Sequence, residues 1–75
     1  MERLIEILEE IVPGEDVRNC TTLVDDSILD SFAIISLVAA LEEEYDITVS
    51  PAELIPDNFN SAEALWSMIE RLMDE

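Results

Sequence analysis

Hydrophobic residues recur at helical spacing in three stretches of the chain. Between Glu2 and Val12, apolar side chains alternate with glutamates in steps of three and four, and Pro13-Gly14 ends the pattern. Residues 31–45 form the longest and most apolar stretch, and residues 62–73 form the third. These patterns predict three amphipathic helices that pack as a small all-α bundle.

The stretch 31–45 is expected to be the central helix, because it has the most apolar side chains. Asp30 directly precedes it and is a good N-cap residue. The helix is expected to end in an acidic run, where the helix dipole disfavours negative charge. Its expected core stripe consists of Phe32, Ile35, Val38 and Leu41, widened by Ile34 and Leu37.

Two short helical turns are expected before the last main helix. Residues 51–54 begin with a proline, which suits the first turn of a helix, and residues 57–59 form the other candidate. Either Asn60 or Ser61 is expected to cap the last helix. Asn60 with Glu63 three residues later resembles a capping box. The fold class is therefore a four-helix bundle of three main helices and one short one.

Residues 15–29 show no sustained period and combine turn-forming with aliphatic side chains. Loops of this length are uncommon in compact domains and are often functional. We therefore expect a long ordered loop after the first helix, held to the core by its aliphatic residues. These residues are Val17, Leu23, Val24, Ile28 and Leu29.

The net charge of the chain limits the classes of molecule that it can bind. Its 75 residues carry 19 acidic side chains against three arginines, with no lysine and no histidine, for a net charge of −16. Nucleic acid and anionic membranes would be repelled, whereas basic protein surfaces would be attracted. Hydrophobic residues make up 49% of the chain, too many for a disordered acidic tail. We expect a monomer in the cytoplasm, without membrane insertion, and Cys20 alone can form no internal disulfide.

The residue inventory excludes most catalytic chemistry. Without His or Lys the chain cannot build a Ser-His, Cys-His or Ser-Lys nucleophile system. A single glycine rules out a glycine-rich phosphate loop, and the ligand spacings of zinc and calcium sites are missing. We therefore expect no enzyme and no metal site. An acidic mimic of nucleic acid is a further, minor alternative.

One serine stands out by its position. Ser31 follows Asp30 at the expected start of the central helix, directly after the long loop. A phosphate ester there would lie near free backbone N–H groups and the positive end of the helix dipole. The alternative is that Asp30 or Ser31 merely caps the helix.

The residues around this serine resemble the acyl carrier protein family. The family's signature is Asp-Ser followed by a large apolar residue, then an aliphatic helix that ends in an acidic run and an aromatic residue. The matching segments are Leu29-Asp30-Ser31-Phe32 and Leu41-Glu42-Glu43-Glu44-Tyr45. Asp26-Ser27 also reads Asp-Ser, but the helix keeps the family register only when counted from Ser31. The resemblance needs no gap between residues 25 and 49, and the flanking helices fit it too.

The resemblance implies one carrier domain over residues 1–75, with 4'-phosphopantetheine esterified to Ser31 beside Asp30. A phosphopantetheinyl transferase would install the arm from coenzyme A, and its thiol would hold an acyl or aminoacyl group as a thioester. A loading ligase and a downstream acyltransferase or synthase would then dock through basic patches. The implied partner-binding residues are Asp26, Phe32, Glu42, Glu43 and Glu44.

Several positions distinguish the chain from fatty-acid carriers. Ala33 and Ser36 occupy positions where those carriers usually have acids, and Ile28 occupies a frequent glycine position. Leu29-Asp30-Ser31-Phe32 and Phe59-Asn60-Ser61 look closer to D-alanyl and other aminoacyl carriers. The cargo stays open between D-alanine, another amino acid, a fatty chain for fatty acid biosynthesis and a polyketide unit.

Two further expectations concern alternatives. If the cargo is an acyl chain, a shallow pocket with space at Ala39 and Ala40 is a place for it. An acidic interaction module of the same fold that has lost the arm is the alternative function.

Overall fold

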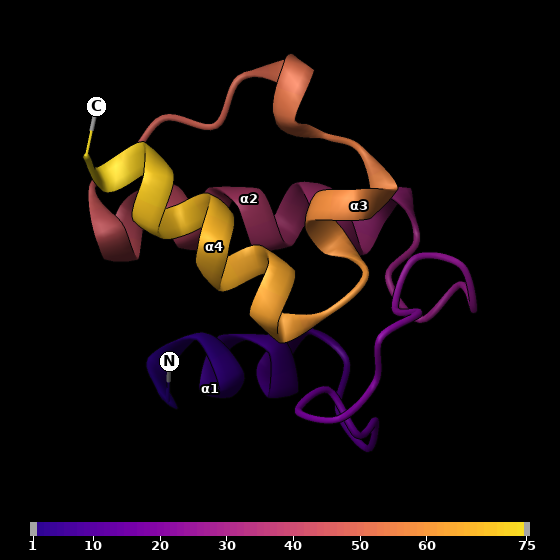
Figure 1. Ribbon diagram of the computed structural model, residues 1–75. Coiled ribbons are helices and arrows are strands. Elements are labelled where there is room, and N and C mark those ends of the chain that lie inside the picture. Colours follow the sequence, from indigo (N-terminus) through magenta and orange to yellow (C-terminus); the bar gives the residue numbers. More distant parts are fainter. Residues whose placement is uncertain (1, 75) are drawn as a thin grey trace.

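The computed structural model describes residues 2–74 and folds them into four α-helices and one 3-10 turn (Figure 1). The elements are α1 Glu2–Ile11, α2 Ser31–Tyr45, η1 Pro51–Glu53, α3 Pro56–Phe59 and α4 Ala62–Met73. No strand occurs in this part of the chain. The predicted class is confirmed: an all-α fold with three main helices, one short helix and a long loop after the first.

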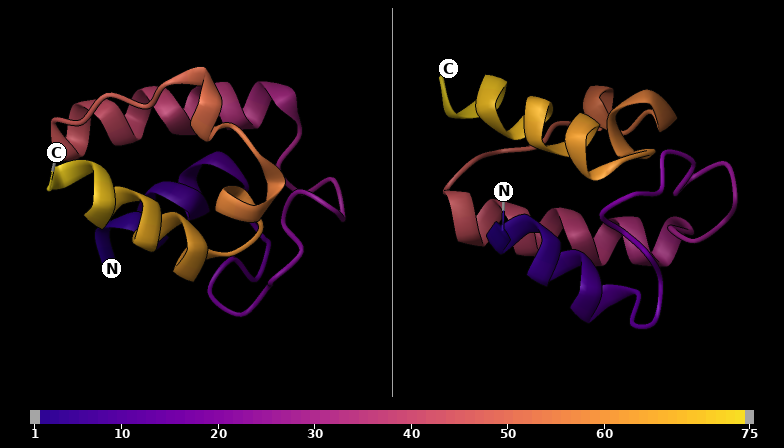
Figure 2. Two further views of the ribbon diagram at one scale, coloured as in Figure 1. Left: turned by 45° about the horizontal axis from the view of Figure 1, so that its top comes forward. Right: turned by 60° about the horizontal axis from the view of Figure 1, so that its bottom comes forward.

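Helix α1 packs against both α2 and α4, and the short α3 packs against α4. The loop between α1 and α2 lies at the end of the bundle where α2 begins, close to α3 (Figures 1 and 2). Buried side chains from all these segments form one core, which is mostly leucine and isoleucine with Phe59 as its largest member. Among residues 2–74 none of the fully buried residues is polar or charged, although the hydroxyl of the half-buried Tyr45 is also shielded from solvent and has no hydrogen-bond partner there. The cohesion of the fold therefore comes from apolar burial.

The long loop is ordered, as predicted. Val17, Leu23 and Leu29 are fully buried in the core, while Val24 and Ile28 are half-buried. Each buried side chain holds the loop against the helices at a separate point along its length. The direction in which the chain enters α2 is therefore fixed by core packing.

The predicted core face of α2 is wrong at Phe32 and Ile35 but right at its other positions, since Ile34 and Val38 also pack partly against the core. Phe32 and Ile35 are 80% and 68% exposed, whereas Leu37 and Leu41 are fully buried. At 100° per residue, Phe32 and Ile35 point roughly 140–160° away from Leu37. Because α2 is apolar on every side, the sequence pattern alone does not define which side faces α1.

Three element boundaries each differ from expectation by one residue. Helix α1 ends at Ile11, although the N–H of Val12 still donates to the carbonyl of Leu8 at 2.9 Å. The first short element is a 3-10 turn that stops at residue 53, and α3 starts at Pro56, one residue before the predicted position.

The caps explain where two of the main helices start. The Asp30 carboxylate accepts a hydrogen bond from the N–H of Ala33 at 2.8 Å, which confirms it as the N-cap of α2. Ser61 caps α4, because its hydroxyl oxygen accepts from the N–H of Ala64 at 3.0 Å. The predicted capping box at Asn60 is therefore wrong, and its side chain is directed at the long loop instead.

Each of the three arginines bridges two separate segments of the fold. Arginine is suited to this task because its planar guanidinium can bind a carboxylate through two parallel hydrogen bonds. The pairs are Arg3 with Glu44, Arg18 with Glu2, and Arg71 with Glu53. All three arginines are thus engaged within the fold, and most carboxylates face solvent without a basic neighbour.

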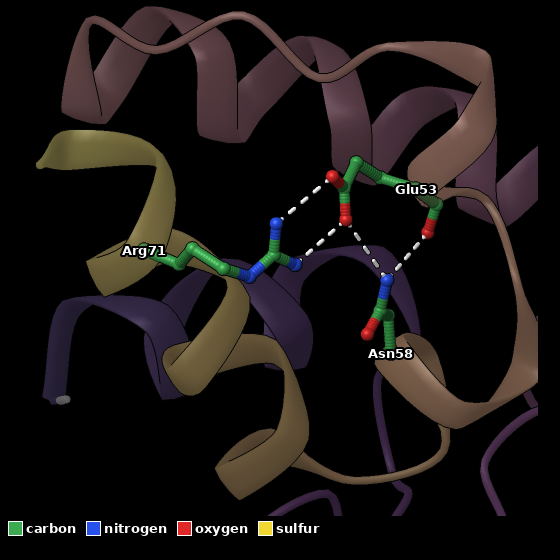
Figure 3. A network of polar contacts seen from close by, with 3 residues as sticks. All are labelled: Glu53, Asn58 and Arg71. Carbon is green, nitrogen blue, oxygen red and sulfur yellow. Dashed lines mark hydrogen bonds and ion pairs between the residues drawn. The ribbon is translucent and has the colours of Figure 1, made fainter. Parts of the chain in front are cut away.

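The Arg71 pair belongs to a small network that joins three elements (Figure 3). Arg71 on α4 donates two hydrogen bonds to the Glu53 carboxylate, at 2.9 and 2.7 Å. Asn58 on α3 donates to the Glu53 carbonyl at 2.9 Å and to its carboxylate at 3.2 Å. The hydrogen bond from Arg71 lowers the pKa of Glu53 below its ordinary value. The network therefore fixes the two short elements, η1 and α3, to each other and to α4.

We expect Glu53→Gln to lower the melting midpoint at neutral pH, because the charged pair with Arg71 is lost. A carboxylate with a lowered folded-state pKa stabilises the fold fully above its ordinary pKa of 4.5. That contribution disappears as the pH falls through the lower folded-state value. The midpoints of wild type and variant, followed by circular dichroism, should therefore converge in strong acid. Glu15→Gln, which removes an exposed charge outside the network, is the control. Identical behaviour of the two variants at neutral pH would contradict the expectation.

The cap of α2 gives a second stability prediction. Asp30→Ala should lower the free energy of unfolding by about 1 kcal/mol, because the N–H of Ala33 loses its acceptor. Asp30→Asn should stay close to wild type, since asparagine caps about as well. Urea unfolding followed by the fluorescence of Trp66 measures both, since Trp66 packs edge-on against Tyr45 at 5.8 Å. Equal loss in the two variants would show that the charge matters and the cap does not.

Candidate functional site

Ser31 is exposed at the first position of α2, directly after its capping residue. Within residues 2–74, its hydroxyl makes no hydrogen bond to any other group. The site lies at the end of the bundle where the long loop meets the start of α2 (Figure 1). The hydroxyl is therefore open to chemical modification by another protein.

The start of α2 favours negative charge next to Ser31. The first N–H groups of a helix have no partner inside the helix, and the helix dipole places positive charge there. Asp30 satisfies the N–H of Ala33, but the N–H groups of Ser31 and Phe32 find no acceptor in the described part of the chain. An anionic group attached to Ser31 would find these donors beside it.

An apolar groove of about 350 Å³ borders Ser31. It runs between the first half of α2 and the segment that forms α3. Its lining residues are Val24, Ser31, Ile34, Ile35, Leu54, Ile55, Pro56 and Phe59. Ser31 is the only polar residue among them, so the groove can accept an apolar group close to the hydroxyl.

The rim of this groove exposes large apolar side chains. Ile35, Leu54 and Ile55 are 68%, 44% and 46% exposed. The expected pocket at Ala39 and Ala40 is not where the groove lies: Ala39 is exposed and Ala40 packs partly against the core. The sequence holds only a weak signal for the true position: Leu54 and Ile55 are adjacent aliphatic residues in the connection between α2 and α4.

Phe32 lies on a different side of α2 from the groove. It borders a second hollow that also includes Glu10, Asp30 and Ser36. Its ring is the most exposed of the large apolar side chains in residues 2–74. Ser31 is therefore flanked by apolar surface on two sides.

The acidic run at the end of α2 is not gathered at the serine. Glu42 is half-buried, and its carboxylate accepts a hydrogen bond from the N–H of Val49 at 2.8 Å. Glu44 pairs with Arg3, so Glu43 alone of the three has no partner among the described residues. At 1.5 Å per residue, Glu43 lies about 18 Å along the helix from Ser31. The structure thus engages two of the three carboxylates within the fold.

The two remaining candidates lie in the long loop. Asp26 is exposed and accepts a hydrogen bond from the Thr22 hydroxyl at 2.6 Å. Ser27, the second serine in an Asp-Ser pair, has a left-handed backbone with φ of 62° and donates its N–H to the Val24 carbonyl at 3.0 Å. Ser27 does not stand at a helix start, so only Ser31 has the free N–H groups of α2 beside it.

Asn60 is a site-supporting residue that sequence reasoning missed. It follows α3 directly, and its side-chain oxygen accepts hydrogen bonds from the N–H groups of Val24 and Asp25, at 2.9 and 3.1 Å. Its carbonyl accepts a third from Leu23 at 2.8 Å. The sequence signals for this role are indirect. Ser61 is a sufficient cap, which leaves the neighbouring asparagine free, and Phe59-Asn60-Ser61 is one of the segments that carry the resemblance stated from the sequence.

Residues 2–74 contain neither a metal-binding cluster of side chains nor a membrane-spanning helix. No group of three or more His, Cys, Asp or Glu side chains is arranged to hold a metal ion. No helix there has the length and the apolar character needed to cross a membrane.

Comparison with known proteins agrees with this geometry. The sequence profile of the phosphopantetheine attachment site family matches residues 2–69. A D-alanyl carrier protein of Listeria welshimeri is 38% identical over 73 residues, which cover 95% of this chain and 94% of the relative. D-alanyl carrier proteins of Lactobacillus delbrueckii subsp. bulgaricus and Lactococcus lactis subsp. cremoris are 30% and 29% identical over 76 residues, which cover 99% of this chain and 94% and 96% of those relatives. No solved structure matches.

The family match covers α1, α2 and most of α4, on both sides of the exposed serine. Proteins of this family bear a covalent 4'-phosphopantetheine arm and present the group that it holds to other enzymes. The resemblance stated from the sequence is therefore confirmed. The chain belongs to the phosphopantetheine attachment site family, and it is a carrier protein without catalytic activity of its own.

Proposed function

We propose that Ser31 carries the phosphopantetheine arm and that the arm delivers D-alanine. The observation that carries the first part is the exposed Ser31 hydroxyl at the start of α2, within Asp30-Ser31-Phe32. A phosphopantetheinyl transferase would form the bond from the serine oxygen to phosphorus. The pyrophosphate bond of coenzyme A breaks in the same step, the nucleotide half leaves, and a base of the transferase takes the serine proton.

The start of α2 supports the product of that step. The phosphodiester keeps one negative charge, and its oxygens would lie next to the free N–H groups of Ser31 and Phe32. Asp30 is already engaged with Ala33, which holds the helix start in place for the attack. The fold thus supplies a rigid, anion-compatible anchor for a flexible arm.

The relatives favour D-alanine as the cargo, since those reported above are D-alanyl carrier proteins. A D-alanyl thioester carries a positive ammonium group, which an apolar groove without acceptors would not stabilise. We therefore place this cargo in water at the end of the arm. An apolar acyl chain is the second candidate, because the groove beside Ser31 would shelter one.

The exposed apolar surface near Ser31 supports docking of partners there, and not on the acidic run at the end of α2. We propose that partner enzymes contact Phe32, Ile35 and the groove rim, because clustered exposed apolar side chains mark interaction sites and aromatic residues are enriched at interface cores. Asp26 and Glu43 would add a negative field that steers basic partners. Glu42 and Glu44 would act within the fold instead, through Val49 and Arg3.

A second copy of the chain is a poor partner for this face. Two copies would each bring a net charge of −16 into one contact. The same charge repels nucleic acid and anionic membranes. We therefore propose a monomer whose partners are a transferase, a loading ligase and a downstream acyltransferase with basic surfaces.

The arm gives the first functional prediction. Incubation with coenzyme A and a broad-specificity phosphopantetheinyl transferase should raise the intact mass by one phosphopantetheine group. Ser31→Ala should abolish the gain, while Ser27→Ala and Ser36→Ala should keep it. A mass gain that survives Ser31→Ala would move the arm to another residue, and an unmodified wild type would favour the interaction module without an arm.

The same armed protein tests the cargo. An adenylating ligase that activates D-alanine should add one D-alanyl group in the presence of ATP, and hydroxylamine should release it as a thioester. An acyl-activating ligase with a fatty acid is the comparison. Preferential loading of the fatty acid would replace D-alanine by the second candidate.

The docking face gives a further prediction. Ile35→Ser should raise the KM of arm transfer about tenfold and leave kcat nearly unchanged, because the side chain contributes binding and not chemistry. Met73→Ser is the matched control, since Met73 is also an exposed apolar residue but lies at the far end of α4. Glu43→Gln should have a small effect that vanishes at high salt. If Glu43→Gln instead costs more than Ile35→Ser, the acidic run is the docking site.

A further inference from the structure

Three consecutive backbone N–H groups in the long loop donate hydrogen bonds to a single residue, Asn60. The carbonyl of Asn60 accepts from Leu23, and its side-chain oxygen accepts from Val24 and Asp25, at distances of 2.8, 2.9 and 3.1 Å. Asn60 lies 29 residues after Ser31 in the chain. These bonds join the loop before the serine to the junction between α3 and α4.

The held segment leads directly to the serine. The N–H of Leu29 donates to the carbonyl of Leu23 at 2.8 Å, so residues 23–29 form one closed turn. Both leucines are fully buried, and the next residue, Asp30, caps α2. Val24 also lines the groove beside Ser31. A shift of this turn would therefore move the residue before the serine and one wall of the groove together.

Asparagine suits this position because it offers an acceptor and a donor. While its oxygen holds the two N–H groups, its Nδ2 faces the Asp25 carboxylate at 3.4 Å. Aspartate would keep the acceptor but would place a second carboxylate against Asp25. Alanine would leave the N–H groups of Val24 and Asp25 without an acceptor.

We propose that Asn60 is a positioning residue, which holds residues 23–29 in the arrangement that presents Ser31 to the transferase. The inference rests on the proposed function, in that Ser31 must be the residue modified. Without Asn60 the turn samples other arrangements and the competent fraction falls. The apparent affinity of the transferase falls by the same factor, while binding at saturation selects the competent arrangement again.

The test compares Asn60→Ala with wild type in arm transfer. We expect KM to rise about tenfold with kcat within about twofold. Asn19→Ala is the matched control, because Asn19 also contacts an aspartate in the long loop, but its side chain holds no backbone N–H. Its kinetics should equal those of wild type.

Amide hydrogen exchange separates positioning from loss of the fold. Asn60→Ala should accelerate exchange at Val24, Asp25 and Leu29, and should leave Leu41 in α2 and Leu65 in α4 protected. Equal acceleration in the helices would mean that the variant acts through global stability and would overturn the inference.

A reciprocal exchange completes the design. Asn60→Asp alone should raise KM, because two carboxylates then face each other. Adding Asp25→Asn restores one acceptor and one donor with their places swapped, and should bring KM back to within about twofold of wild type. If Asn60→Ala accepts the arm with the KM of wild type, or if the double variant does not recover that KM, the inference about Asn60 is overturned while the proposed function stands. A wild type that accepts no arm at Ser31 overturns the proposed function and this inference with it.

Discussion

Apolar burial between α1, α2 and α4 has to hold together a chain whose surface repels itself. The net charge is −16, and all three arginines are engaged in pairs between segments. Exposed pairs of this kind contribute little each, so they orient elements more than they stabilise them. Within residues 2–74 the buried core has no charged side chain, and its one buried side-chain polar atom without a hydrogen-bond partner is the hydroxyl of Tyr45, which packs against the core. The loop before Ser31 is ordered for the same reason, because its leucines are part of that core.

Because apolar burial holds the fold together, a helix can be oriented from the sequence only where its apolar residues lie on one side. Helices α1 and α4 alternate clearly between apolar and charged residues, and both lie within one residue of their predicted ranges. Helix α2 is apolar on all sides, so its position was predictable, but the sequence did not show that Phe32 and Ile35 would be left exposed. The exposed side is defined only when α1 covers Leu37 and Leu41. The core does not have room for every apolar side chain of α2. Phe32 and Ile35 therefore remain on the surface next to Ser31.

The candidate site likewise has features that the sequence predicts and features that it does not. Ser31 and its cap Asp30 lie next to each other in the sequence, and a local motif is enough to predict them. The groove is built from three separate stretches of the chain, so no single stretch of sequence describes it. The sequence left the cap of α4 open between Asn60 and Ser61 and gave no sign of the loop contact, because capping depends on local sequence and the hydrogen bond from Val24 spans 36 residues. Long-range hydrogen bonds of this kind have no periodic pattern that a sequence would reveal.

The distribution of charge around the serine suits a carrier that must meet several enzymes in turn. Helix α2 has no charged residue from Ser31 to Leu41, while Asp25, Asp26 and Asp57 stand exposed on neighbouring segments. Exposed charges act over roughly a Debye length of 8–10 Å and raise the rate of encounter. An apolar groove acts only at contact, and a groove of this size gives a modest interface. Long-range attraction with limited contact area gives fast association and fast release, which is what repeated loading and delivery by one arm require.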